Sequence, residues 1–317
     1  MKIVAGMGAI DDYIALCEAG ADEVFCGFVP YSWNKKYGNL MPLNRREVFY
    51  YNVQISSISD MKILRKMVDK YKVPVTITFN SLYYTEHQYN EIIIIISELV
   101  SIGFKEFIIA DIGLILKLRQ KKINCKIQLS GEACEINRLS MKLFNNFNIS
   151  RYIFHRKNLI SDMKNCIEDN KELSLEYEAF ILNEKCHYTG AYCNSLHCDE
   201  MVHLCKVPYK IARVNEYSKD FYMDDKLSLT EDIDCESEDY IIGNSGCGLC
   251  FLRQLKNAGI THLKVVGRGK YIDYMVNDIK ALKEALDLIE EVDNDSEYKN
   301  IIRNNIFKGK CSKECYY

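Results

Sequence analysis

Short runs of β-branched and other apolar residues alternate with helical patterns along most of the chain. Such runs predict strands at residues 2–6, 23–28, 73–80, 107–111, 125–130, 151–155, 174–182 and 262–267. Helical patterns follow them at residues 11–20, 59–70, 90–101, 113–120, 137–145, 159–169, 249–258 and 274–291.

Eight strands, each followed along the chain by a helix, are typical of a (β/α)8 barrel. We therefore expect an α/β fold of the TIM-like barrel type. A doubly wound open sheet is the alternative, because periodicity alone cannot show that a sheet closes. Both architectures place ligands at the carboxyl ends of the strands, so the polar residues there are the first candidates for function.

The composition is that of an ordinary globular protein and excludes several other classes. The 317 residues are 48% hydrophobic and 27% charged, which rules out wholesale disorder. The length suits one barrel with an insertion, so we expect a single domain over residues 1–317. A net charge of −3 gives no general basic field, which makes nucleic acid an unfavoured but not excluded partner.

The sequence suggests neither a membrane span nor a secretion signal. The densest apolar run, residues 92–96, falls far short of the roughly 18 residues that cross a bilayer. The first residues lack the small-residue cleavage site of a signal peptide. We therefore expect a cytoplasmic protein with no membrane partner, in a reducing setting where clustered cysteines are metal ligands or redox groups more often than disulfides.

A long irregular stretch follows the seventh predicted strand, and it carries half of the 14 cysteines. We expect residues 186–250 to form a cysteine-rich insertion, with an acidic portion at residues 220–240. Loops of this length are uncommon in compact domains unless something orders them, and metal ligation would do so. The cysteines are Cys186, Cys193, Cys198, Cys205, Cys235, Cys247 and Cys250.

Four thiolates from this group suit either tetrahedral Zn²⁺ or an iron–sulfur cluster. A zinc ribbon normally has two close cysteine pairs, whereas within this stretch only Cys247 and Cys250 are so spaced. Dispersed ligands favour a [4Fe–4S] cluster, with Zn²⁺ as the alternative. Of the other cysteines, Cys17, Cys125 and Cys166 lie in core patterns, Cys26 and Cys134 are core or rim residues, and Cys311 and Cys315 are either idle thiols or a second small site.

Polar residues near the predicted strand ends are the candidates for catalysis and substrate binding. Glu176 and Glu178 lie two apart on one strand and should face the same way. Glu178 is a candidate proton-transfer group or a partner of Arg156 or Arg268, and the alternative is an ion pair that only stabilises the barrel. Arg156, and Arg268 between two glycines, could bind an anion. The catalytic candidates are Asn80, Asp111, His155, Arg156 and Glu178, and the substrate-binding candidates are Ser130, Glu132 and Arg268.

Several of these segments, in this order, resemble peptidase family U32. They are Asn80-Ser81-Leu82, Asp111-Ile112-Gly113, the strand end at Ser130, Glu178-Ala179-Phe180, the Cys186 to Cys193 spacing, Cys205-Lys206 to Tyr209, and Lys264-Val265-Val266-Gly267-Arg268. The resemblance implies a barrel fold. It implies either a collagenase-like peptidase or an oxygen-independent hydroxylase that holds a four-iron cluster through four cysteines.

Carried onto this chain, the resemblance implies cluster ligands at Cys186, Cys193 and Cys250. Some family members have a Cys-x-x-x-Cys pair here, and this chain has Met201 at one position of that pair. The fourth ligand would therefore be Cys205 or Cys198. Cys247 is an additional candidate beside Cys250. The chain also has Val266 where the family has an acidic residue.

We expect an iron–sulfur enzyme that modifies a small molecule, a peptide or RNA by a redox reaction such as hydroxylation, with an electron donor or partner subunit. A U32-type peptidase is one alternative. No His-Glu-x-x-His or Gly-x-Ser-x-Gly motif supports a hydrolase. The other alternative is a non-catalytic iron–sulfur partner subunit.

Overall fold

The computed structural model describes residues 1–38, 41–45, 53–133, 136–186 and 240–317. Its strands form one closed barrel in sequence order, and every neighbouring pair is parallel, including the pair that joins the last strand to the first. The predicted (β/α)8 barrel is therefore confirmed, and the open-sheet alternative is wrong. The strands are β1 (Lys2–Met7), β2 (Glu23–Gly27), β3 (Val75–Phe79), β4 (Glu106–Ile109), β5 (Lys126–Leu129), β6 (Ile149–Ile153), β7 (Glu176–Leu182) and β8 (His262–Val265).

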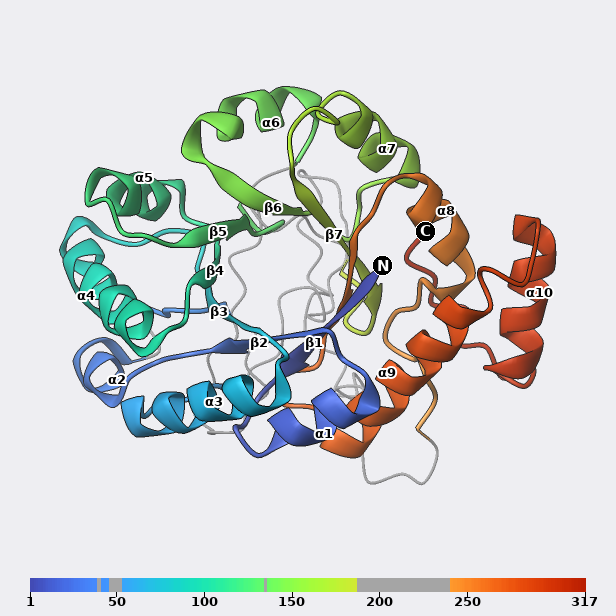
Figure 1. Cartoon of the computed structure of the whole chain (residues 1–317), viewed down its shortest axis with the longest axis horizontal. Helices are drawn as coiled ribbons and strands as arrows, with labels where there is room; N and C mark the ends of the chain where they lie inside the picture. Colours follow the sequence, from blue (N-terminus) through green and yellow to red (C-terminus); the bar gives the residue numbers. More distant parts are fainter. Residues whose placement is uncertain (39–40, 46–52, 134–135, 187–239) are drawn as a thin grey trace, which may run out of the picture.

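Helices surround the barrel, as Figure 1 shows. They are α1 (Asp12–Ala19), α2 (Tyr31–Tyr37), α3 (Ile58–Tyr71), α4 (Glu86–Ile102), α5 (Ile112–Gln120), α6 (Arg138–Phe144), α7 (Ile160–Glu168), α8 (Leu252–Asn257), α9 (Ile272–Asp287) and α10 (Asp295–Asn305), with short 3-10 helices η3 (Asn145–Phe147) and η6 (Leu249–Phe251). Apolar residues of the strands' outer faces and of the helices form one continuous core. Cys26, Cys125 and Cys166 are buried in it and Cys17 packs against it, as the sequence predicts.

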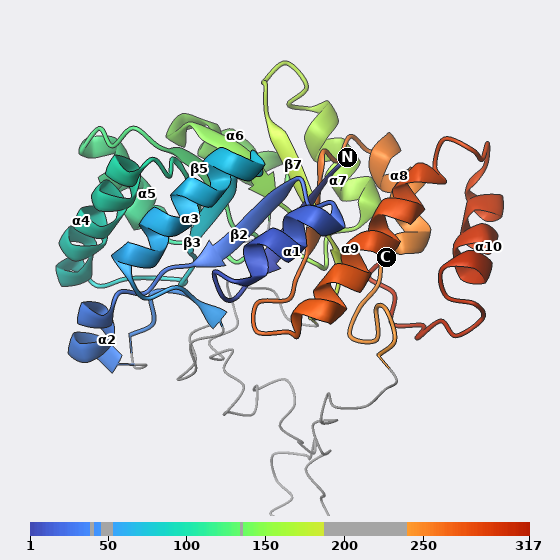
Figure 2. The ribbon, with the colours of Figure 1, turned by 60° about the horizontal axis from the view of Figure 1, so that its bottom comes forward.

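Helices α2 and α10 were not predicted, and several strand boundaries differ from the prediction, of which that of β6 is an example. Helix α2 is only seven residues long and buries one of them, Trp33, so its periodicity is weak. Helix α10 lies at the outer edge of the molecule, beyond α8 and α9 (Figure 2), and buries only Tyr298 and Ile302. Strand β6 begins at Ile149, two residues earlier than predicted, directly after Asn148 with its left-handed φ of 54°.

The barrel interior consists of successive layers of side chains. At the amino ends of the strands, Glu23, Arg151 and Glu178 form a buried charged cluster. An apolar layer comes next, formed by Val4, Phe25, Ile108, Ile153, Phe180 and Val266. The interior is thus filled by side chains up to the carboxyl ends, where the remaining space is found.

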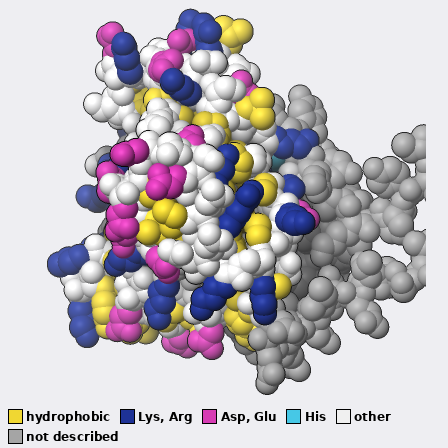
Figure 3. Space-filling view, turned by 90° about the vertical axis from the view of Figure 1, so that its right-hand side faces the viewer, with side chains coloured by type: hydrophobic (Ala, Val, Ile, Leu, Met, Phe, Trp, Pro, Cys, Tyr) yellow, Lys and Arg dark blue, Asp and Glu magenta, His cyan; other side chains and the backbone are white. Residues whose placement is uncertain are grey.

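Charged side chains of both signs are interspersed on the face that carries α8, α9 and α10 (Figure 3). The described part of this face has no broad area of a single charge, in keeping with the net charge of −3. Among the described helices, none has both the length and the apolar character needed to cross a membrane.

Candidate functional site

A pocket lies at the carboxyl end of the barrel and holds about 610 Å³ of space, part of it open to solvent. Its apolar floor is the interior layer described above, of which Phe25, Ile108, Ile153, Phe180 and Val266 line it. Four cationic side chains (Arg45, Arg156, Lys264 and Arg268) and two acidic ones (Glu132 and Glu184) line its polar part. The described lining therefore favours an anionic ligand.

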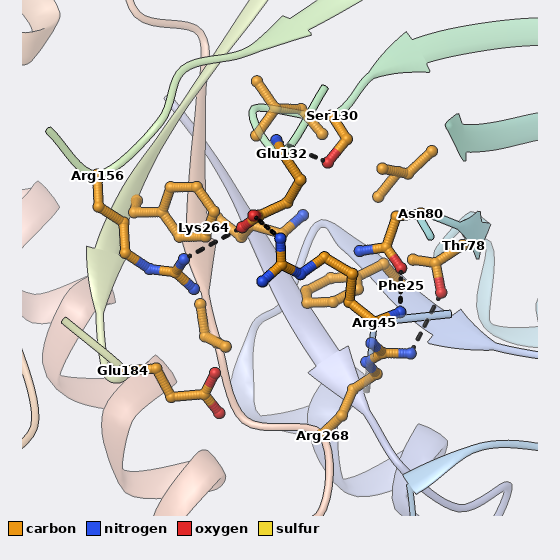
Figure 4. Close-up of a pocket in the computed structure, with 14 residues that line it drawn as sticks. Phe25, Arg45, Thr78, Asn80, Ser130, Glu132, Arg156, Glu184, Lys264 and Arg268 are labelled. Atoms are coloured by element: carbon orange, nitrogen blue, oxygen red, sulfur yellow. Dashed lines mark hydrogen bonds and ion pairs between the residues drawn. The ribbon is translucent and has the colours of Figure 1, made fainter. Parts of the chain in front are cut away.

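Glu132 joins two of the pocket arginines (Figure 4). Its Oε2 lies 2.7 Å from Nη1 of Arg45, and its Oε1 lies 3.5 Å from Nη1 of Arg156. Glu132 follows the end of β5, where its backbone N–H donates to Oγ of Ser130. Because one carboxylate serves two guanidinium groups, these three side chains leave an excess of positive charge facing the pocket.

Arg156 is buried beside an aromatic ring. Its guanidinium carbon lies 4.0 Å from the centre of the Phe180 ring, and its Nε has no hydrogen-bond partner among the described residues. Burial by itself lowers the pKa of Arg156, but Tyr316, Glu132, Glu184 and Cys186 act in the opposite direction and hold it above its ordinary value. Arg156 is therefore always charged, and the thiol of Cys186 lies within its electrostatic range.

Arg268 reaches the opposite side of the pocket from the segment after β8. Its Nη1 donates to Oγ1 of Thr78 at 3.2 Å, as Figure 4 shows. The guanidinium passes so close to Gly27 that a Cβ there would lie 2.6 Å from Nη1. Because residue 27 is a glycine without a Cβ, there is room for the guanidinium of Arg268.

Glu178 belongs to the charged cluster below the apolar layer, and each of its carboxylate oxygens has a cationic partner. Its carboxylate lies 2.7 Å from Nζ of Lys264 and 2.9 Å from Nη1 of Arg151. Burial raises the pKa of Glu178, but the positive charges of Lys264 and Arg151 together lower it by more, so the net shift is downward. Glu178 thus remains ionised at neutral pH and is held by two cations, neither of which is Arg156 or Arg268.

The structure brings together five of the eight predicted site residues. Asn80, Ser130, Glu132, Arg156 and Arg268 all line the pocket. The other three do not line it. Glu178 lies in the charged cluster, facing the same way as Glu176 as predicted, because both contact Arg151.

Asp111 is engaged as the N-cap of α5. Its carboxylate accepts hydrogen bonds from the backbone N–H groups of Leu114 and Tyr84 and from the hydroxyl of Tyr89. These contacts give Asp111 a structural role, because the carboxylate of an N-cap residue satisfies backbone N–H donors at the start of a helix.

Sequence reasoning missed other lining residues, among them Arg45 and Lys264. Lys264 stands in one of the segments that carry the family resemblance, and its position on β8 could have identified it. Arg45 lies in the connection between α2 and α3, where no periodicity points to the pocket. The lining residues missed were Phe25, Arg45, Thr78, Ile108, Ile153, Phe180, Glu184, Lys264 and Val266.

His155 lies just beyond β6 and is 1% exposed. Burial lowers its pKa to about 4, and its Nε2 has no hydrogen-bond partner among the described residues. An unfolded histidine, with an ordinary pKa near 6.5, takes up a proton first as the pH falls. The free energy of unfolding should therefore fall by up to about 3 kcal/mol from this residue between about pH 6.5 and 4.

Urea denaturation at several pH values, compared with a His155→Asn variant, measures this contribution. The variant should lose less stability than the wild type over this pH range. Equal losses in the two proteins would show that His155 is protonated normally in the folded state.

The described cysteines of the 186–250 region fall in two surroundings. Cys186 follows β7, near Arg156. Cys247 and Cys250 come just before α8, and their thiols interact electrostatically with Cys311 and Cys315. Cys193, Cys198, Cys205 and Cys235 lie outside the described residues, as does Cys134. Cys186 thus lies at the carboxyl end of the barrel, whereas Cys250 lies before α8, within electrostatic range of Cys311 and Cys315.

Comparison with known proteins identifies a family. The family model described as peptidase family U32 matches residues 8–316. A solved structure described as the U32 peptidase Mk0906 shares 7% identity over 58% of this chain and 70% of that chain, with a TM-score of 0.43. A dihydrodipicolinate synthase from Bacillus clausii shares 9% identity over 98% and 82%, with a TM-score of 0.48. No match to a curated protein was found.

Proposed function

Because this chain belongs to peptidase family U32, we propose that it is an iron–sulfur enzyme that modifies a substrate at the barrel mouth by a redox reaction such as oxygen-independent hydroxylation. The observation that supports the proposal is that Cys186 follows β7 at the carboxyl end of the barrel, within electrostatic range of the pocket residue Arg156. A thiolate ligand there would hold a cluster beside the substrate. Cys186 would be one ligand, and Cys193, Cys250 and either Cys205 or Cys198 would be the others.

A bound cluster would supply one-electron transfer, with a separate donor providing the electrons. The residues of the chain would position the substrate. Arg156 and Arg268, on opposite sides of the pocket, would bind a carboxylate or phosphate group of a small molecule or peptide. Glu132 would keep Arg45 and Arg156 in place, and Phe25 and Phe180 would exclude water from below.

Anaerobic purification followed by iron and sulfide analysis and visible spectroscopy tests the proposal. We expect about four irons and four sulfides per chain, as a [4Fe–4S] cluster contains. Cys186→Ala and Cys193→Ala should each lose most of the iron and the visible absorbance. Cys166→Ala, a buried core thiol in α7, is the matched control and should retain both.

Protein that contains neither iron nor sulfide after anaerobic purification or reconstitution would contradict the proposal. Peptide cleavage by such metal-free protein, abolished by the loss of a single nucleophile, would instead indicate a peptidase.

A further inference from the structure

The tail of the chain, residues 310–317, lies along the segment that precedes η6. The backbone N–H of Cys247 donates to the carbonyl of Glu314, and the N–H of Tyr316 donates to the carbonyl of Cys247, both at 2.8 Å. Cys315 therefore lies opposite Cys247 in a parallel bridge, and Cys247 in turn pairs with Leu182 of β7. Residues 310–314 form no helix, so these backbone bonds fix the path of the tail beside the carboxyl end of β7.

Two tyrosines of the tail also bond directly to the backbone of β7 and of the residue after it. The hydroxyl of Tyr317 donates to the carbonyl of Phe180 at 2.7 Å, and the hydroxyl of Tyr316 donates to the carbonyl of Asn183. The register between β7 and β8 shifts between Phe180 and Leu182, so the two bonds lie on either side of an irregularity in the strand. Such irregularities bend a strand and redirect its side chains, and here the tail holds both sides of the bend.

The ring of Tyr316 occupies a defined place behind the pocket. It packs against the apolar interior layer that forms the pocket floor. A Cβ on Gly246 would lie 3.0 Å from Cζ of Tyr316 and 2.9 Å from the backbone nitrogen of Lys185. Because residue 246 is a glycine, the ring has room between the floor and the segment before η6.

Asn183, which accepts the hydroxyl of Tyr316, joins the end of β7 to the pocket floor. It is 0% exposed, and its Nδ2 donates to the carbonyl of Val266 at 3.0 Å and to Oδ2 of Asp278 at 2.7 Å. Its φ is 70°, and that of the pocket residue Glu184 is 52°. Two successive non-glycine residues in the left-handed region persist only where their surroundings hold them. The bond from Tyr316 is one of the contacts that do so.

Tyr316 lies within electrostatic range of Arg156, whose guanidinium carbon is 4.0 Å from the centre of the Phe180 ring. Burial raises the pKa of Tyr316, and the charge of Arg156 acts in the opposite direction. The phenol is therefore neutral at neutral pH. A neutral neighbour leaves the charge of the guanidinium available to a ligand, whereas a carboxylate such as Glu132 offsets part of it.

We propose that Tyr316 is a positioning residue for the anion pocket. Its hydroxyl fixes Asn183 at the end of β7, and its ring supports the floor that carries Arg156, so that the tail is part of the binding site. The inference rests on the anion-binding role that the proposed function gives to Arg156, and it needs no iron–sulfur cluster.

Isothermal titration calorimetry with inorganic phosphate tests the proposal. Tyr316→Phe, which removes only the hydroxyl, should bind phosphate about fivefold more weakly than the wild type, as the loss of one typical hydrogen bond would give. Tyr298→Phe is the matched control. Tyr298 is 0% exposed and its hydroxyl donates to the carbonyl of Ala285 at 2.8 Å, but it lies on α10 at the outer edge of the molecule.

Both variants lose a bond between a phenol and a buried carbonyl, so both should unfold at a lower temperature than the wild type. Only Tyr316→Phe should lose phosphate affinity, and added phosphate should raise its unfolding temperature less than that of Tyr298→Phe. This second measurement separates a weakened site from a weakened fold.

Tyr316→Phe that binds phosphate as tightly as the wild type would overturn the proposal. So would equal losses of affinity in the two variants, because the effect would then follow stability alone. A wild-type chain that binds no phosphate would also overturn it, since there would be no anion site to support. Absence of iron and sulfide would refute only the proposed cluster, because phosphate binding is measured without it.

Discussion

Arg151→Met is expected to lower the free energy of unfolding by about 3–5 kcal/mol, the usual cost of removing one partner from a buried ion pair. Arg151 is 2% exposed, and its guanidinium lies 2.7 Å from Glu23, 2.9 Å from Glu178 and 2.9 Å from Glu176. Without it, Glu178 would keep its ion pair with Lys264, but Glu23 and Glu176 would lose their ion pairs with Arg151. Chemical denaturation of the purified chain measures the loss.

Arg138→Met is the matched control, because it removes an arginine from a largely exposed pair with Asp169 in which Arg138 is 59% exposed. Exposed pairs contribute about 0–1 kcal/mol, so this variant should remain close to the wild type. Similar stabilities for the two variants would show that the interior cluster does not stabilise the barrel, and would return Glu178 to the candidates for proton transfer.

Arg156→Met is expected to weaken the binding of inorganic phosphate by about 30-fold or more. Removing a buried charged partner from a recognition site costs about 2–5 kcal/mol, and 2 kcal/mol corresponds to about 30-fold in affinity. The phosphate affinity of Arg156→Lys should fall between those of Arg156→Met and the wild type, because lysine keeps the charge but loses the planar guanidinium fork. Isothermal titration calorimetry with phosphate measures all three affinities.

Arg138→Met again serves as the control and should bind phosphate as the wild type does. A wild type that binds phosphate no better than Arg156→Met would contradict an anion site at the barrel mouth. The pocket would then need a ligand whose affinity does not depend on the buried guanidinium groups.

The sequence alone could predict the barrel because each strand and helix buries its own apolar pattern. β2, β7 and β8 lie within one or two residues of their predicted ranges for this reason. The rim residues Ser130, Arg156 and Arg268 could be predicted because the end of a parallel strand is also an end of the barrel.

The remaining features depend on contacts between distant segments. The partners of Glu178, for example, come from β6 and β8, and nothing in the local pattern distinguishes Lys264 from Arg268 as its partner. Arg45 reaches the pocket from an irregular connection. Cys315 lies opposite Cys247 only because the tail returns to the segment before η6.

In the described part of the chain, the apolar layer of Val4, Phe25, Ile108, Ile153, Phe180 and Val266, backed by the charged cluster, closes the barrel interior below the pocket and leaves it open at the carboxyl ends of the strands. A substrate therefore enters, and a product leaves, through the same pocket opening at the carboxyl ends of the strands. The two compete for one passage, so the reaction cannot run as a flow from one end of the barrel to the other. Substrate entry and product release through that opening, as well as the chemical step, would then limit the turnover rate.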